Sequence, residues 1–387
     1  MRILWQSAAP FVHTGYGTQA ASLLPRLKRA GHAVTAFAQF GLQAGRGSYA
    51  GVPVVAGNSD PFGNDIVVEH YAALKADLLL TMVDTWALDE YGRKGMRWCP
   101  WTPVDHDPVP RKVLDSLRGA HEVLAFSEFG LRELTGSGVE ARLIPLGVES
   151  EVFKPLGATE AIRRRMGLDE YAFVVGFVGL NDRYPCRKGQ DRALEAFARF
   201  HGRHLESVLY MHTSARPSPG GIDLAGYAEV LGVGGCTRFA DPYQYRMGLS
   251  AGRMAQTYNC MDVLGAPSTG EGFGLPIVEA QACGTPVIVT DFTSMGELCG
   301  AGWKVRPSDT FVTPLLSYQA LPSVDGIAEA LEMAWERKGD ACLREQAAEF
   351  GRRFDWDGLF AKAWIPWLNE MEARLGASRG TARKGAA

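Results

Sequence analysis

The stretch from Thr269 to Thr290 constrains the fold of this chain more than any other part of the sequence. Before it, residues 263–267 form a short apolar run that predicts a strand. Pro276 marks the start of a helix, because proline at the first helical position gives up only an amide that has no helical partner. Gly284 is the expected left-handed stop of that helix, and residues 286–289 predict a second, buried strand. The order strand, glycine-rich loop, helix and strand is typical of a parallel α/β sheet.

The loop of this stretch predicts an anion site, because backbone amides at a helix N-terminus attract negative charge. These amides belong to Gly272, Phe273, Gly274 and Leu275. Glu271 lies in the loop and Glu279 about one turn into the helix, so both are expected to face a ligand whose phosphates sit on the helix end. A carboxylate accepts hydrogen bonds from two neighbouring hydroxyls, as on a ribose or hexose ring. Taken alone, Glu279 also fits a residue that only complements the helix dipole, and Glu271 also fits a solvated loop residue.

The sequence Glu-Gly-Phe-Gly-Leu-Pro from Glu271, followed by Glu279-Ala280 and by residues 282–287, closely resembles the donor-site signature of the retaining family 4 glycosyltransferases. The resemblance implies the GT-B fold, an α/β architecture of two facing Rossmann-like domains with a cleft between them and a C-terminal helix that returns to the first domain. It implies a hexosyltransferase that moves a sugar from a nucleotide diphosphate sugar to an acceptor, with retention of the anomeric configuration. It also implies that Glu271 orients the sugar hydroxyls and that Glu279 contacts the ribose.

Composition agrees with an ordinary enzyme of two domains, since 387 residues are too many for one core. The net charge of −3 argues against a generally basic nucleic-acid binder. Seven cysteines are scattered without a Cys-x-x-Cys pair, and we interpret them as reduced thiols of a cytoplasmic protein. We expect neither a signal peptide nor a membrane span, because the chain starts directly with a strand and no apolar run has the required length.

Alternating strand and helix signals divide the chain. We expect an acceptor-side Rossmann-like domain over 1–150 and a nucleotide-sugar-binding Rossmann-like domain over 151–358. The resemblance implies that a helix at 359–375 packs back on the first domain. Residues 376–387 are small and basic, and we expect them to form a disordered tail.

Two loops of the first domain follow predicted strands, at the sheet edge where such sheets bind ligands. The first loop contains Gly15, Tyr16 and Gly17 but no third glycine at Rossmann spacing, so no dinucleotide cofactor is expected. From the residues alone, this loop fits a tight structural turn as well as a ligand site. Family 4 enzymes carry a glycine-rich loop here that faces the donor phosphates and the acceptor, and the resemblance therefore makes these three residues donor-binding candidates.

The second loop, at 101–108, places His106 between Asp105 and Asp107. It fits a simple turn, or an imidazole whose tautomer is fixed by a carboxylate. Family 4 enzymes often place a histidine at this point beside the reacting sugar, so the resemblance makes His106 and Asp105 catalytic candidates together with Glu271. Which of the three loop residues faces the sugar stays open here, and His13 is a further candidate.

Arg187 and Lys188 follow the buried strand predicted over 173–180. Two adjacent cations at the carboxyl end of a strand fit a solvated charge pair, or a site that neutralises a diphosphate. The resemblance supports the diphosphate, because Lys188-Gly189 matches the family pattern. The family arginine is displaced in this chain, so either Arg183 or Arg187 takes its role, and we favour Arg187.

We expect no metal and no cofactor, because the cations and the helix end stabilise the leaving diphosphate and no Asp-x-Asp metal signature is present. A nucleotide-sugar donor is the expected partner, while the acceptor stays open among a saccharide, a protein, a small molecule and a nucleic acid. A GT-B phosphorylase or a sugar-nucleotide hydrolase is the alternative function. A non-catalytic protein that binds sugar or nucleic acid is a further alternative.

Overall fold

The computed structural model describes residues 1–216 and 220–384, and its contacts divide the chain into two compact units. The first unit comprises residues 1–104 and 109–147 and the segment from Trp356 onward. The second comprises residues 105–108 and 148–355. Apart from the short segment 105–108, the chain changes unit at 147–148 and 355–356, and the sequence-based boundaries are 150–151 and 358–359.

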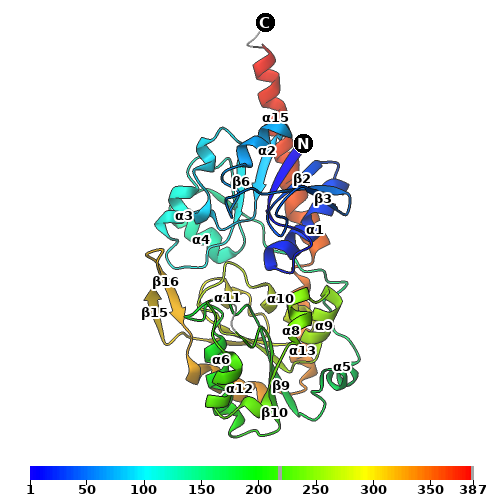
Figure 1. The fold of residues 1–387 in the computed structure, drawn as a ribbon, viewed down its shortest axis with the longest axis vertical. Helices are drawn as coiled ribbons and strands as arrows, with labels where there is room; N and C mark the ends of the chain where they lie inside the picture. The colour runs from blue at the N-terminus through cyan, green and yellow to red at the C-terminus, as the bar shows by residue number, and fades with distance from the viewer. Residues whose placement is uncertain (217–219, 385–387) are drawn as a thin grey trace. The chain divides into compact units, whose positions relative to one another are not determined.

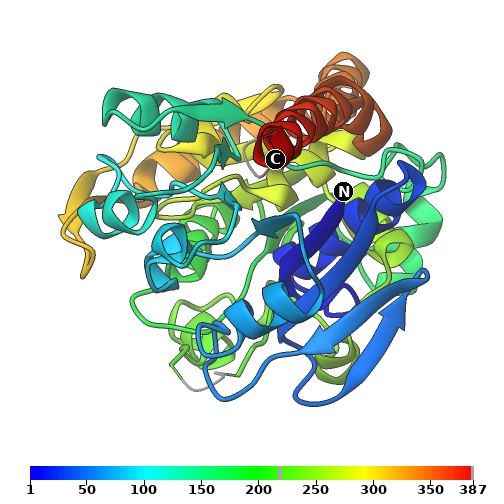
Figure 2. The same ribbon diagram turned by 90° about the horizontal axis from the view of Figure 1, so that it is seen from above.

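The first unit is built on an eight-stranded sheet in the order β3-β4-β2-β1-β5-β6-β7-β8. All its neighbouring strands pair in parallel except β3 and β4, which form an antiparallel edge (Figures 1 and 2). The strands are β1 Arg2–Ala8, β2 Ala33–Phe40, β3 Arg46–Tyr49, β4 Val52–Ala56, β5 Leu78–Thr81, β6 Trp98–Thr102, β7 Val123–Ala125 and β8 Ala141–Leu143. The helices are α1 Gly15–Arg29, α2 Val67–Ala73, α3 Arg111–Ser116, α4 Glu128–Gly136, α14 Trp356–Leu359 and α15 Ile365–Lys384, with short 3-10 turns at Thr85–Ala87 and Tyr91–Arg93.

Helix α1 begins at Gly15. The Thr14 side chain accepts a hydrogen bond from the Gly17 amide and caps the helix, so the expected glycine loop forms the first turn of α1. A Cβ atom at Gly17 would lie 2.2 Å from the carbonyl oxygen of Val12. Glycine is therefore required there by packing alone.

The last helical segment packs into the first unit through tryptophans. The rings of Trp101 and Trp364 meet edge to face with centroids 4.9 Å apart, and Trp367 packs on Trp364 at 5.6 Å. A π-helical turn at Phe360–Trp364 precedes Pro366, which has no N–H to donate to the preceding turn. Helix α15 includes residues 376–384 of the tail that was expected to be disordered, and residues 385–387 lie outside the described part of the chain.

The second unit holds a parallel six-stranded sheet in the order β11-β10-β9-β12-β13-β14. The strands are β9 Phe173–Val178, β10 Ser207–His212, β11 Thr237–Phe239, β12 Val263–Ala266, β13 Val287–Thr290 and β14 Gly302–Val305, and a separate antiparallel hairpin joins β15 Asp309–Val312 to β16 Tyr318–Leu321. The helices are α5 Thr159–Met166, α6 Gln190–His201, α7 Leu224–Val230, α8 Pro242–Met247, α9 Ala251–Asn259, α10 Leu275–Ala282, α11 Ser294–Glu297, α12 Val324–Glu336 and α13 Ala341–Arg352, with a 3-10 turn at Gly234–Cys236. Figure 1 shows the hairpin β15–β16 set apart from this sheet.

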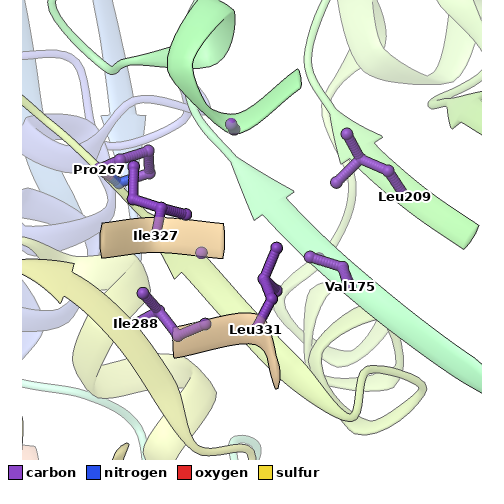
Figure 3. A pocket seen from close by; sticks show the side chains of 9 residues that line it. Val175, Leu209, Pro267, Ile288, Ile327 and Leu331 are labelled. Atoms are coloured by element: carbon purple, nitrogen blue, oxygen red, sulfur yellow. The ribbon is translucent and has the colours of Figure 1, made fainter. Parts of the chain in front are cut away.

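Successive side chains of each strand point to opposite faces of the second sheet, and both faces of such a parallel sheet are covered. Val175, Val263 and Ile288 face the core that α6 and α12 cover. A small apolar cavity of about 10 Å³ remains on that face, where Ile327 and Leu331 of α12 approach the sheet (Figure 3). Among the described residues, no helix is both long and apolar enough to cross a membrane.

Candidate active site

The polar residues predicted from the sequence meet at one edge of the second sheet. Strands β9 and β12 are neighbours, but the chain builds the sheet outward from them in opposite directions. Crossover connections on the two sides then lie on opposite faces, which leaves room for a ligand at the carboxyl ends of the two strands. The loop after β9 carries Arg187 and Lys188, and the loop after β12 carries Glu271.

The carboxylate of Glu271 is the centre of this cluster. The Lys188 Nζ donates to its Oε1 at 2.5 Å, and the Ser268 Oγ donates to the same oxygen at 2.7 Å. The Arg187 Nη1 lies 3.6 Å from Oε2 and donates to the Gly270 carbonyl oxygen at 2.9 Å. Only 12% of the Glu271 side chain is exposed, so these contacts replace most of its hydration.

The charges of the cluster fix the protonation state of Glu271. Burial alone would raise its pKa, but the positive charges of Lys188 and Arg187 and the hydrogen bonds from Lys188 and Ser268 outweigh burial and lower the pKa to about 2. Burial and the neighbouring Arg187 in turn lower the pKa of Lys188, against the attraction of Glu271. Glu271 is thus ionised at neutral pH and can accept hydrogen bonds but not donate a proton.

The loop at 105–108 belongs to the second unit and lies against the same cluster. The Nδ1 of buried His106 lies 2.7 Å from the Asp105 Oδ1, and since the carboxylate only accepts, Nδ1 carries the hydrogen. Burial acts to raise the pKa of Asp105, but the hydrogen bond and charge of His106, with the charge of Arg187, lower it. The Arg187 Nη1 is 4.0 Å from the Asp105 Oδ2. Asp105, His106 and Glu271 are therefore in one constellation.

The strand β16 connects the histidine loop with the Glu271 loop. Asp107 and Tyr318 exchange backbone hydrogen bonds at 3.2 and 3.3 Å. The buried Gln319 donates to the Asp105 carbonyl oxygen at 3.4 Å and accepts from the Thr269 hydroxyl at 2.9 Å. A Cβ atom at Gly270 would lie 2.2 Å from that same Asp105 oxygen, so only glycine permits this close approach.

The N-terminus of α10 is arranged as the glycine-rich loop predicts. Gly274 precedes the helix with φ of 112°, a conformation that favours glycine, and no side chain caps the helix there. The amides at this end belong to Gly272, Phe273, Gly274 and Leu275. This helix end is therefore suited to an anion.

Glu279 lies on α10 and differs from Glu271 in its electrostatics. Its Oε2 accepts a hydrogen bond from the Tyr258 hydroxyl at 2.8 Å. Burial raises its pKa to about 7, although the Tyr258 hydrogen bond acts in the opposite direction. A small change in surroundings therefore decides whether Glu279 is ionised at neutral pH.

The remaining candidates are outside the contacts of this cluster or belong to the first unit. Arg183 forms an exposed ion pair with the adjacent Asp182 at 3.0 Å, so Arg187 is the arginine that lies beside Glu271. Gly15, Tyr16 and Gly17 belong to the first unit, whereas the cluster lies in the second. The Tyr16 hydroxyl donates to the Asp84 carboxylate at 2.8 Å. Tyr16 follows β1 and Asp84 follows β5, and these two strands are neighbours in the first sheet.

Sequence reasoning missed several polar residues that hold the site together, and all of them except Ser268 lie far in sequence from the group that they contact. They are Ser268, Tyr258, Gln319, Thr293 and Ser294. Only Ser268 adjoins a recognised motif. In the described ranges, no group of three or more histidine, cysteine, aspartate or glutamate side chains is arranged to hold a metal ion.

Comparison with known proteins identifies the family. Residues 172–315 match the family described as Glycosyl transferases group 1. A D-inositol 3-phosphate glycosyltransferase of Kribbella flavida is 34% identical over 318 residues, which cover 77% of this chain and 69% of the relative. The chain belongs to the group 1 glycosyltransferases. The resemblance of residues 271–287 to such enzymes is thereby confirmed.

Further relatives match a smaller part of the chain. The enzyme of the same name from Geodermatophilus obscurus is 38% identical over 223 residues, which are 53% of this chain and 47% of that protein. The chain thus spans about half the length of this relative.

Solved structures extend the likeness to nearly the whole fold. Sucrose-phosphate synthase from Thermosynechococcus elongatus superposes with a TM-score of 0.74 at 19% identity, over 96% of this chain and 99% of that one. Anabaena HepE in complex with UDP-glucose gives 0.70 at 16% identity, over 97% and 100%. At such identity the likeness concerns the fold alone, and it confirms the expected GT-B class with a largely parallel sheet in each unit.

Proposed function

We propose that this group 1 glycosyltransferase transfers a hexose from a nucleotide diphosphate sugar to a hydroxyl of an acceptor, with retention of the anomeric configuration. The observation that carries the proposal is the convergence of Arg187, Lys188 and ionised Glu271 at the carboxyl ends of β9 and β12. Two cations beside the N-terminus of α10 suit a diphosphate, and a carboxylate that only accepts hydrogen bonds suits sugar hydroxyls.

The transfer follows from the development of charge. The acceptor oxygen forms a bond to the anomeric carbon while the bond from that carbon to the phosphate oxygen breaks, and the acceptor proton passes to the released phosphate on the same face. Negative charge grows on the diphosphate, where Arg187, Lys188 and the amides at α10 stabilise it. Glu271 holds the sugar hydroxyls. His106, with Nδ1 bound to Asp105, has Nε2 available to accept from the sugar.

The substrates to test first come from the comparisons. HepE was solved with UDP-glucose, and the curated relatives are named for D-inositol 3-phosphate. We therefore propose UDP-glucose as the first donor and D-inositol 3-phosphate as the first acceptor. The assay separates the glycosylated product from free glucose and from glucose phosphate, with and without the acceptor. Glucose released at the same rate in both reactions would instead identify a sugar-nucleotide hydrolase.

Glu271→Gln tests the role of the central carboxylate. We expect the transfer rate to fall about 100-fold or more, because the neutral amide holds the sugar hydroxyls less firmly as charge develops. Glu336→Gln at the exposed end of α12 is the matched control and is expected to keep full activity. Full transfer activity in Glu271→Gln would exclude the proposed role.

Independence from metal ions and a cytoplasmic location remain predictions. The first is checked by assaying transfer after dialysis against a chelator, where we expect an unchanged rate. A loss of activity that added Mg²⁺ or Mn²⁺ restores would contradict it.

A further inference from the structure

The backbone at Thr293 is strained next to the candidate site. Its φ of 51° and ψ of −136° lie in a region that residues with a Cβ atom rarely adopt, and a β-branched side chain is especially disfavoured there. Such conformations persist where the surroundings impose them, and they cluster at functional sites. Thr293 precedes α11, yet its side chain does not cap that helix. Helix capping therefore does not explain the residue.

The strained turn aims two hydroxyls at the loop that carries Glu271. The Thr293 Oγ1 accepts from the Glu271 amide at 3.0 Å. The Oγ of the next residue, Ser294, lies 2.8 Å from the carbonyl oxygen of Glu271 and 2.7 Å from that of Phe273, so its single hydroxyl hydrogen is shared between these two acceptors. Both backbone polar groups of Glu271 are thus bound from one turn, and Thr293 and Ser294 are buried. These bonds limit the directions that the Glu271 side chain can take.

Glycine would adopt this φ without strain but has no hydroxyl. We propose that Thr293 is a positioning residue, whose hydroxyl fixes the backbone of Glu271 so that the carboxylate meets the hydroxyls of the donor sugar. This inference rests on the function proposed above. It predicts that the chain retains a strained threonine here for the rate of transfer and not for the stability of the fold.

Two variants separate the hydroxyl from the strain. Thr293→Gly removes both, and we expect an unfolding midpoint equal to or above that of the wild type. We expect its kcat for transfer to fall about 10- to 100-fold, because Glu271 is no longer held in place. Thr293→Ser keeps the hydroxyl, and its kcat should stay within roughly threefold of the wild type.

Hydrogen exchange of the loop 269–275, followed by mass spectrometry in the same three proteins, gives a readout that does not depend on transfer. We expect faster exchange in Thr293→Gly and unchanged exchange in Thr293→Ser. The inference is overturned if Thr293→Gly transfers at the wild-type rate or leaves the exchange unchanged. The inference is also overturned if Thr293→Gly lowers both the unfolding midpoint and kcat, and Thr293→Ser shows the same two losses. If the wild type itself transfers no sugar, the proposed function fails, and the role of Thr293 in transfer fails with it.

Discussion

At the scale of single residues, Glu279 links the site to pH. Its pKa of about 7 in the folded protein lies above the ordinary 4.5. Between these values the folded protein binds more protons than the unfolded chain, so this group makes the protein less stable as the pH rises from about 4.5 to about 7. The glutamine of Glu279→Gln carries no such penalty and can still accept the Tyr258 hydrogen bond. We expect the variant to be more stable than the wild type at pH 8, by roughly 2 kcal/mol because partial exposure reduces the full effect, and to lose most of this advantage at pH 5.

Urea unfolding of both proteins at pH 5 and pH 8 measures this difference. Glu329→Gln on the exposed face of α12 is a suitable control, for which we expect no dependence of the stability difference on pH. An equal stability difference at both pH values for Glu279→Gln would show that Glu279 does not titrate between them.

At the scale of elements, the cavity against the second sheet allows a matched pair of glycine substitutions (Figure 3). Gly265 of β12 lines it, and an added Cβ would meet only the Gly176 carbonyl oxygen at 3.6 Å. We expect Gly265→Ala to raise the free energy of unfolding by about 1 kcal/mol, because the methyl group fills the void and the unfolded chain loses freedom. Gly176→Ala on the adjacent β9 should lower it, since its Cβ would lie 2.0 Å from the Met261 sulfur. Equal effects of the two variants would contradict the packing described here.

The elements were predicted best where the local pattern decides them. The apolar run at 173–180 forms β9 over Phe173–Val178, as the sequence predicts. The hairpin β15–β16 was not predicted, and the bridge from Tyr318 of β16 to Asp107 joins residues about two hundred positions apart, which no local pattern reveals. The strain at Thr293 was also beyond prediction, since nothing local in the sequence distinguishes a threonine with positive φ.

At the scale of the whole molecule, each unit has a core of its own, so we expect two unfolding transitions by calorimetry. Trp367 is fully buried in the first unit. Trp367→Ala should therefore lower the free energy of unfolding of that unit by about 3–5 kcal/mol. UDP-glucose at 100 times its dissociation constant should raise the free energy of unfolding of the second unit by about 2.7 kcal/mol, because the Glu271 cluster lies in that unit. A single transition that both changes shift would contradict this division.

The two-unit α/β organisation was predictable from the repeated alternation of strands and helices, and the sequence singled out Glu271, Arg187 and Lys188, which the structure brings together. The sequence could not show that residues 105–108 group with the second unit, since they follow a strand of the first. That grouping depends on Gln319 and Tyr318, which no local pattern connects to His106.

We propose that the cations beside Glu271 bind the donor diphosphate, and calorimetric titration with UDP-glucose measures this binding. Arg187→Ala should weaken binding about 10- to 100-fold, the usual loss for a charge-assisted contact. Arg183 lies four residues before Arg187 and forms an exposed ion pair with Asp182. Arg183→Ala should therefore leave the affinity within about twofold of the wild-type value. We expect this contrast in affinity between the two variants. Equal affinities of wild type and Arg187→Ala, or a larger loss in Arg183→Ala, would contradict it.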